Sequence, residues 1–204
     1  MNSSPPGASR LRWVRRAALW AVVITAAFLL DDAVRPLMLS LRVEPVYRLM
    51  KILTWIGKGW VLLLAAVILL ATGLWKRRAW LREAGLKGAV ALAASGVVVQ
   101  TVKHLAGRPR PKLWDRGETA WGPSFQSGHD SFPSGHTISA FAFAAVLAGV
   151  YPKGRWIWYL LAVLVGFTRL YLDAHYASDV LAAAGLGLIC GAWALRLRLK
   201  QAAT

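Results

Sequence analysis

The sequence predicts an all-α membrane protein, in which six transmembrane helices form one bundle with an interfacial helix between spans 1 and 2. Three observations predict this fold. Hydrophobic residues make up 57% of the 204 positions, they fall into separate uncharged runs, and basic residues cluster between the runs. A soluble bundle of this composition would lack the polar residues to cover its surface, so that alternative is disfavoured. We expect a single domain over residues 1–204, with residues 1–9 as a disordered polar tail.

Six uncharged apolar runs mark the expected spans. A helix needs about 20 mostly apolar residues to cross the hydrocarbon core, and charged flanks extend shorter runs because long side chains snorkel outward. Each run reaches that length once its flanks are counted. The runs are Ala17–Leu30, Gly59–Trp75, Gly88–Val102, Thr137–Pro152, Trp156–Thr168 and Val180–Leu195.

Three shorter segments complete the expected architecture. Pro45–Gly57 carries apolar residues at helical spacing, which indicates an amphipathic helix in the membrane interface. Gly107–Phe132 is rich in Pro and Gly and is expected to be a long structureless loop. We expect this loop, the interfacial segment and the lateral gaps between helices to select the head group. Gly187 and Gly191, four residues apart in the last run, predict close packing between helices.

The distribution of charge predicts the orientation in the membrane. The N-terminal tail, the loop Lys76–Lys87, the turn Lys153–Arg155 and the C-terminal tail hold more than half of the 25 Lys and Arg, but only Glu83 of the nine acids. Because basic loops stay in the cytoplasm, we expect both termini there, in a multi-pass protein of the cell (inner) membrane. The dispersed net charge of +16 suits membrane lipids as partners and not nucleic acid.

Polar residues that could carry chemistry collect at the helix ends on the opposite, extracytoplasmic face. Any single Lys or Arg at such a position is explained by snorkelling. Three cations and two histidines at one level, contributed by four helices, instead favour a functional site. The candidate residues are Lys103, Arg110, Ser134, Gly135, His136, Arg169, His175 and Asp179.

The cations and one helix start suit a phosphate group. Lys103, Arg110 and Arg169 offer positive charge and many hydrogen-bond donors to phosphate oxygens. The stretch Phe132–His136 leads into a helix whose first backbone N–H groups could bind further oxygens, and Gly135 lets the chain approach closely.

The two histidines are candidates for nucleophilic and acid–base catalysis. His175 and Asp179 are four residues apart and would share one helical face if the last helix has begun at His175. The carboxylate could then fix the tautomer of His175 and leave its other nitrogen free to attack phosphorus. His136 would protonate the leaving oxygen. A metal site is the main rival, but the cations outnumber the carboxylates and would repel a divalent ion, so we expect no metal and no cofactor.

Three motifs in this region resemble the signature of the type 2 phosphatidic acid phosphatase (PAP2) superfamily, which includes membrane lipid phosphatases and soluble vanadium haloperoxidases. The motifs are Lys103-x6-Arg110-Pro111, Pro133-Ser134-Gly135-His136 and Arg169-x5-His175-x3-Asp179. The resemblance implies a six-span fold, an extracytoplasmic catalytic face and hydrolysis without metal. It implies that His175 is the nucleophile and forms a phosphohistidine, His136 the general acid, and Asp179 the residue that orients His175. The positions that match phosphate-binding residues are Lys103, Arg110, Ser134, Gly135 and Arg169.

Three positions near the motifs need an interpretation of their own. Thr168 stands where the family usually has Ser, and it keeps the hydroxyl. Arg108, like Arg110, precedes a proline, but only Arg110 has the family spacing from Lys103, so Arg108 would add charge to the pocket. Asp173 follows Arg169 by four residues, and we expect an ion pair between them.

The leading hypothesis is therefore a lipid phosphatase that cleaves a phosphomonoester or diphosphate. Undecaprenyl diphosphate, phosphatidylglycerol phosphate, phosphatidic acid and lipid A phosphates all place a phosphate at the membrane surface with a tail in the bilayer. A phosphotransferase with the same site is the alternative. An anion transporter is disfavoured because the charges gather at one face instead of following a path through the membrane. A vanadium haloperoxidase is disfavoured because the haloperoxidases of the family are soluble, whereas this chain is expected to span the membrane.

Overall fold

A computed structural model describes residues 6–198 of the chain, and every regular element in that range is helical. Residues 1–5 of the expected tail lie outside the described residues, and residues 6–9 belong to the first helix. The elements are α1 (Pro6–Ser40), α2 (Glu44–Leu53), the 3₁₀ turn η1 (Thr54–Gly57), α3 (Gly59–Trp75), α4 (Ala79–Ala106), α5 (Pro111–Trp114), α6 (Gly135–Val150), the 3₁₀ turn η2 (Pro152–Gly154), α7 (Arg155–Tyr171) and α8 (Ala177–Arg196).

Each of the six apolar runs corresponds to a different helix, the run Gly59–Trp75 coincides with α3, and the run Thr137–Pro152 extends two residues beyond the end of α6. Within the described residues, two stretches, Ala79–Trp114 and Ala177–Arg196, are long and apolar enough to cross a membrane. A third is added if Glu44–Gly57 and Gly59–Trp75, which meet at 53°, count as one bent span. The helical fold class is confirmed, and the number of six spans stays a prediction.

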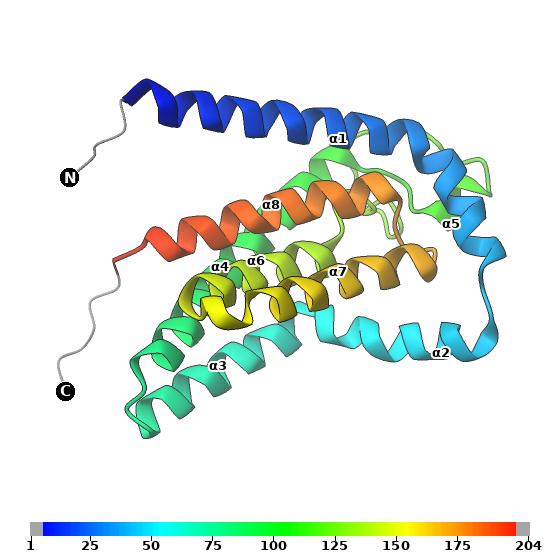
Figure 1. Cartoon of the computed structure of the whole chain (residues 1–204). Helices are drawn as coiled ribbons and strands as arrows, with labels where there is room; N and C mark the ends of the chain where they lie inside the picture. The colour runs from blue at the N-terminus through cyan, green and yellow to red at the C-terminus, as the bar shows by residue number, and fades with distance from the viewer. Residues whose placement is uncertain (1–5, 199–204) are drawn as a thin grey trace.

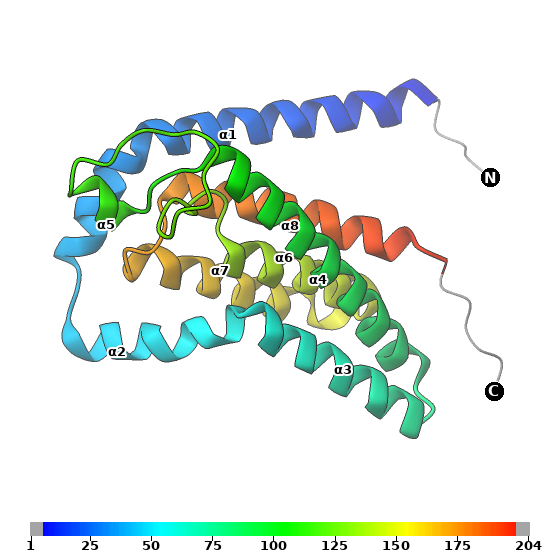
Figure 2. The same cartoon turned by 180° about the vertical axis from the view of Figure 1, so that it is seen from behind.

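Helix α6 lies at the centre of the bundle. It packs most extensively against α8 and also contacts α7 and α4, while α3 packs on α4 and α1 on α8. Its side chains from Thr137 to Leu147 are almost all buried. The start of α1, the end of α8 and the turn between α3 and α4 lie at one end of the molecule, whereas α5 and the long loop lie at the other (Figures 1 and 2). The basic segments identified in the sequence therefore share one end.

Small residues let α6 and α8 approach until backbone meets backbone. A Cβ atom at Gly187 would lie 2.5 Å from the carbonyl oxygen of Ile138, and one at Gly191 would lie 2.6 Å from that of Ala142. Nothing larger than glycine fits at either position without a shift of the helices. The close packing predicted from this pair is confirmed.

The segment expected at the interface is helical, as α2 followed by η1. Helix α2 has an apolar and a polar side and lies against α7. Its last turn leads into Thr54, which is buried near the end of α7. The helix between the first two apolar runs is therefore confirmed, and its position in the membrane interface stays a prediction.

The long loop is more ordered than its composition indicates. Helix α4 ends at Gly107, whose left-handed conformation (φ 51°) lets its N–H bond to the carbonyl of Lys103. The loop then contains the single turn α5 and folds back on itself. The N–H of Arg110 donates to the carbonyl of Gly128 at 2.8 Å, and that of Ser131 donates to the carbonyl of Arg108 at 3.0 Å. Apart from α5 the loop has no regular secondary structure, as expected, and the two backbone hydrogen bonds bring the end of the loop beside its start.

Candidate active site

His175 lies in the turn between α7 and α8, two residues before α8 begins. Its Nδ1 is 2.8 Å from the backbone carbonyl oxygen of Ser131 and 3.6 Å from a carboxylate oxygen of Asp179. The condition under which His175 and Asp179 would share a helical face is not met, because α8 begins after His175. The two side chains nevertheless approach each other, and the direct partner of the ring is the Ser131 carbonyl.

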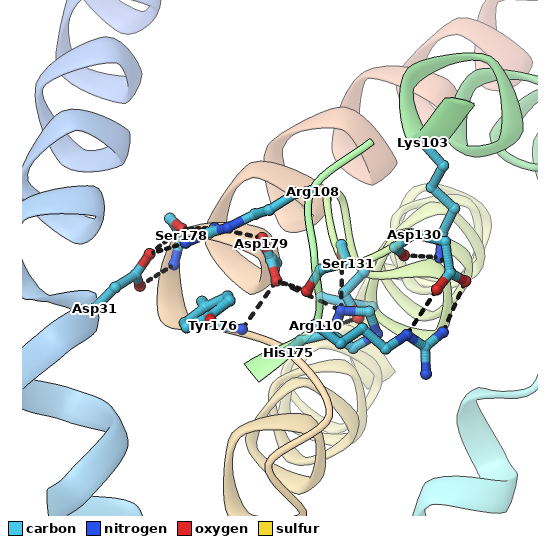
Figure 3. A network of polar contacts seen from close by, with 12 residues as sticks. Asp31, Lys103, Arg108, Arg110, Asp130, Ser131, His175, Tyr176, Ser178 and Asp179 are labelled. Atoms are coloured by element: carbon cyan, nitrogen blue, oxygen red, sulfur yellow. Dashed lines mark hydrogen bonds and ion pairs between the residues drawn. The ribbon is translucent and has the colours of Figure 1, made fainter. Parts of the chain in front are cut away.

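Asp179 caps the first turn of α8 and is completely buried. One carboxylate oxygen accepts hydrogen bonds from the Ser131 hydroxyl (2.6 Å) and from the backbone N–H of Tyr176 (2.9 Å). The other accepts from Arg108 at 2.6 Å. Ser131 therefore joins the two residues: its hydroxyl donates to Asp179 and its carbonyl accepts from His175 (Figure 3).

The environment of His175 favours the neutral ring. Burial lowers the pKa of His175 to about 4, against the opposing effect of the Asp179 carboxylate. A neutral ring that donates its Nδ1–H to the Ser131 carbonyl has its lone pair on Nε2. The structure thus gives His175 one fixed nitrogen and one nitrogen suited to nucleophilic attack.

Lys103 and Arg110 meet at a shared carboxylate, that of Asp130. Lys103, in the last turn of α4, donates its ammonium to the backbone carbonyl (2.5 Å) and the carboxylate (3.2 Å) of Asp130. Arg110 donates two hydrogen bonds of 2.8 Å each to the same carboxylate. Burial alone would raise the pKa of Asp130, but the hydrogen bonds and charges of Arg110 and Lys103 outweigh burial and lower it to about 2. The predicted cations are therefore together, with a charged acid between them.

The second motif starts α6 beside Lys103. Ser134 is the N-cap residue, and its own N–H donates to the Asp179 carbonyl at 3.1 Å, so it is not available to a ligand. The first hydrogen bond of the helix runs from Ile138 to the Ser134 carbonyl, which leaves the N–H groups of Gly135 and His136 without a helical acceptor. A Cβ atom on Gly135 would touch the Lys103 side chain at 3.9 Å. The helix start and Lys103 therefore border the same space.

Arg169 lies in the last turn of α7 and is buried. It donates to the hydroxyl of Thr54 in η1 at 2.7 Å, while its Nε has no partner. Besides burial, which has the largest effect, the charges of Arg169 and Lys103 lower the pKa of both His136 and His175, and His175 also lowers that of His136. The structure therefore brings the predicted cations and both histidines into one site.

Two of the expected contacts are different in the structure. Asp173 pairs with Arg35 of α1 at 2.8 Å, not with Arg169. Arg108 is buried and points away from Lys103, because it pairs with Asp179 and with Asp31 of α1 (Figure 3). Arg108 does not add charge to the phosphate pocket.

Three residues of the site were missed in the sequence. Asp130 is an acidic residue three positions before the second motif, on a face where cations were expected to act on phosphate. Asp31 is an ionisable residue at the end of an apolar run, a position that by itself suggests function. Ser131 carries no such signal, because its two contacts depend on the folded loop.

The donors present do not form a metal-binding group. Within residues 6–198, no cluster of three or more His, Cys, Asp or Glu side chains has suitable geometry. The carboxylates of Asp179 and Asp130 are already paired with arginine or lysine. The site has the parts of a phosphate-handling enzyme: a neutral buried imidazole, a second imidazole and three cations at one end of a helical bundle.

The comparisons with known proteins agree with this description. Residues 84–203 match the PAP2 superfamily. The chain is 32% identical to lipid A 1-phosphatase of Rhizobium johnstonii over 200 residues, which cover 92% of this chain and 80% of that protein. The chain therefore belongs to the PAP2 superfamily, and the family resemblance of the three motifs is confirmed.

Two crystal structures share the fold. The transmembrane PAP2 type phosphatidylglycerolphosphate phosphatase from Bacillus subtilis superposes with a TM-score of 0.68 at 25% identity, over 89% of this chain and 92% of that chain. LpxE from Aquifex aeolicus superposes with a TM-score of 0.64 at 26% identity, over 81% of this chain and 94% of that chain. The Rhizobium relative is named as a phosphatase and the Bacillus subtilis protein as a transmembrane phosphatase, and this chain shares the fold of both crystal structures.

Proposed function

We propose that this protein is an integral membrane phosphatase that hydrolyses a phosphomonoester or diphosphate of a lipid through a phosphohistidine on His175. The observation that carries the proposal is the neutral, buried ring of His175, held by Ser131 through Nδ1 with its Nε2 lone pair free to react. The charges of two of the three cations, Arg169 and Lys103, act on that ring and help to lower its pKa.

In the first step, Nε2 of His175 attacks phosphorus and the bond from phosphorus to the lipid oxygen breaks. Burial and the neighbouring cations lower the pKa of His136 to about 3 in the free protein, so its ring takes up a proton only as the anionic phosphate group binds. His136 then donates this proton to the leaving oxygen, and the lipid product departs as an alcohol or, from a diphosphate, as a monophosphate. The charges of Lys103, Arg110 and Arg169 stabilise the phosphoryl oxygens as negative charge develops on them, and they supply the stabilisation that a metal would otherwise provide.

In the second step, water attacks the phosphohistidine. His136, which lost its proton in the first step, accepts one from the attacking water, and the bond between phosphorus and Nε2 breaks. Inorganic phosphate leaves and the neutral ring of His175 is restored. Asp130 competes with phosphate for Lys103 and Arg110, so substrate binding requires these donors to be shared or exchanged.

An apolar groove supports a lipid as the substrate. It has a volume of about 190 Å³, is lined only by apolar side chains of η1, α3, α6 and α7, and includes Ile56 and Val165. Gly57, the next residue after Ile56, lies against His136 and Val165. A hydrocarbon chain in this groove would run from the bilayer towards the histidines. Because the basic segments lie at the other end of the bundle, we place the site on the extracytoplasmic face of the cell membrane.

A second cavity supports a polar head group. It has a volume of about 380 Å³, and its lining includes the charged side chains of Arg110 and Asp130 and the polar side chains of Gln100, Gln126 and Ser127. Amide and hydroxyl groups suit the hydroxyls of a sugar or glycerol next to the phosphate. A sugar phosphate of the lipid A type is the first substrate to test, since a relative aligned over 92% of this chain is a lipid A 1-phosphatase.

The test is phosphate release by the purified protein from lipid A, undecaprenyl diphosphate, phosphatidylglycerol phosphate and phosphatidic acid in detergent micelles. We expect release from at least one of them and none from the His175→Ala variant. Labelled donor with and without an acceptor lipid separates hydrolysis from transfer: label in inorganic phosphate supports a hydrolase, whereas label in the acceptor alone replaces it with a phosphotransferase.

Metal removal tests the role given to the cations. Because Lys103, Arg110 and Arg169 carry the charge of the phosphoryl group, excess EDTA should leave the rate of phosphate release within about twofold. Complete loss that Mg²⁺ or Zn²⁺ restores would contradict the mechanism and favour a metal site.

A further inference from the structure

Asp31 is a buried carboxylate at the level of the active site, although it belongs to α1, outside the three motifs. Only 3% of its surface is exposed. One oxygen accepts from the backbone N–H of Ser178 at 3.0 Å, and the other accepts from the Ser178 hydroxyl at 2.5 Å and from Arg108 at 2.8 Å. Asp32, the next residue, is exposed. Of these two adjacent carboxylates, only that of Asp31 is hydrogen-bonded to the first turn of α8.

Arg108 connects Asp31 to the catalytic carboxylate. One of its terminal nitrogens donates to Asp31, and the other donates to Asp179 and to the Ser178 hydroxyl at 2.6 Å each. The guanidinium carbon lies 3.9 Å from the ring centre of Tyr176 and 4.8 Å from that of Trp121. The aromatic rings and the two carboxylates leave this side chain little freedom to move.

A continuous series of contacts leads from α1 to the reactive ring. It runs from Asp31 to Arg108, from Arg108 to Asp179, from Asp179 to the Ser131 hydroxyl, and from the Ser131 carbonyl to Nδ1 of His175 (Figure 3). Each of these contacts is 2.8 Å or shorter. Charge also matters, because one guanidinium shared by two buried carboxylates cannot move towards either without leaving the other unpaired.

Helix α1 also contacts the segment just before His175. Arg35, one helical turn after Asp31, donates two hydrogen bonds to Asp173, at 2.8 and 3.2 Å. Asp173 has a left-handed backbone (φ 54°) and lies two residues before His175. Helix α1 therefore contacts the turn both before and after the nucleophile.

We propose that Asp31 is a positioning residue for the phosphatase reaction: it holds Arg108 and the start of α8, and through Asp179 and Ser131 it aligns Nε2 of His175 for attack. The inference rests on the proposed function, in which His175 is the nucleophile. Residues outside the direct contacts of a reactive imidazole commonly change rates by about 10- to 100-fold through such alignment. Because Asp31 does not contact the phosphate-binding cations, its removal should lower kcat and leave phosphate binding unchanged.

The experiment compares Asp31→Asn with Asp32→Asn in full-length protein purified in detergent. Asparagine has nearly the same shape, so the first variant removes the charge of the buried residue, and the second removes that of an exposed neighbour. We expect Asp31→Asn to lower kcat about 10- to 100-fold, with KM and the inhibition constant for inorganic phosphate within about twofold of wild type. Asp32→Asn should behave as wild type in all three measurements.

Two outcomes would overturn the proposal. Equal kcat for the two variants would mean that Asp31 has no role in alignment. A parallel loss of kcat and of inorganic phosphate binding in Asp31→Asn would mean that the residue maintains the whole site. A wild-type protein that releases phosphate from none of the four lipids would instead refute the proposed function, so the two failures are distinct.

Ser178→Ala keeps the inference testable if Asp31→Asn does not fold. This variant removes the hydroxyl that links Asp31 and Arg108. It leaves the charges of Asp31, Arg108 and Asp179 in place. We expect kcat to fall about three- to tenfold, again with inorganic phosphate binding unchanged. An unchanged kcat in Ser178→Ala would overturn the proposal.

Discussion

Arg108 and Arg110 are two residues apart, each precedes a proline, and their environments are opposite. The Arg108 side chain is 6% exposed and lies between two buried carboxylates, those of Asp31 and Asp179. The Arg110 side chain is 37% exposed and shares Asp130 with Lys103. An extended backbone would place residues two apart on the same side, so the opposite environments come from their separate partners: Asp31 of α1 and Asp179 of α8 hold Arg108, and Asp130 of the loop holds Arg110. One arginine supports the nucleophile from behind, and the other faces the phosphate.

The comparison shows that the same residue type serves two physical purposes within one motif. The buried arginine gains its free energy from two fixed partners and would be costly to leave unpaired. The half-exposed arginine has a single partner that a phosphate group can replace, since both are anions that accept paired hydrogen bonds. Stability should therefore depend on Arg108, and substrate binding on Arg110.

The largest effect is expected at His175, the residue whose reaction both arginines support. His175→Ala removes the nucleophile, so turnover of every substrate should fall by at least about 10³-fold, and no acid-labile phosphoenzyme should form. Rapid quench with ³²P-labelled lipid measures the phosphoenzyme. Near-normal rates in this variant would refute the covalent mechanism.

Matched substitutions at the two arginines test the comparison directly. Arg108→Gln leaves Asp31 and Asp179 without their cation and should destabilise the fold by about 3–5 kcal/mol, seen as a lower Tm in detergent. Arg110→Gln should leave Tm nearly unchanged and lower kcat/KM about 10²-fold, because it removes a donor from the charged transition state. If both variants had the same Tm, the division of roles would be wrong.

Asp130→Asn tests whether the acid competes with phosphate. The variant removes a negative charge from the donors of Lys103 and Arg110, so inorganic phosphate should inhibit at about three- to tenfold lower concentration. Asp115→Asn, which changes an exposed acid paired with Arg35, is the matched control and should have no such effect. Weaker phosphate inhibition in Asp130→Asn would mean that Asp130 instead holds Arg110 in place for the substrate.

A further effect concerns acid stability. The pKa of His175 is lowered from 6.5 to about 4 in the folded protein, so the fold favours the neutral ring. The resulting contribution to stability is complete above about pH 6.5 and is lost as the pH falls towards 4. Between pH 7.5 and pH 5, wild type should lose on the order of 2 kcal/mol more than His175→Ala. Parallel curves of Tm against pH for the two proteins would contradict the low pKa.

Much of the helical fold could be predicted from the sequence, because apolar runs of this length form helices in almost any context. The start of α6 at Ser134 and the position of Arg169 in the last turn of α7 also followed from motif spacing. The ion pairs could not be predicted. Asp173 pairs with Arg35, 138 residues away, and not with Arg169, four residues away, because tertiary packing decides which charges meet.

The contact between Ser131 and His175 was out of reach for a related reason. It depends on the fold of the long loop, where backbone hydrogen bonds join Ser131 to Arg108 and Arg110 to Gly128. Backbone hydrogen bonds of this kind do not require particular residue types, so the sequence does not reveal them. The sequence therefore indicated which side chains do chemistry, while the groups that hold them in place became visible only in three dimensions.

The close approach of α6 and α8 has a consequence for how the site can open. His136 is on the first turn of α6 and Asp179 on the first turn of α8, and glycines at 187 and 191 lock these helices together deeper in the bundle. The two helices should behave as one rigid body. Any breathing motion that admits a substrate must then come from the elements around this pair, such as η1 with Gly57 against His136. A spin label on α2 should report larger motion on substrate addition than labels on α6 and α8.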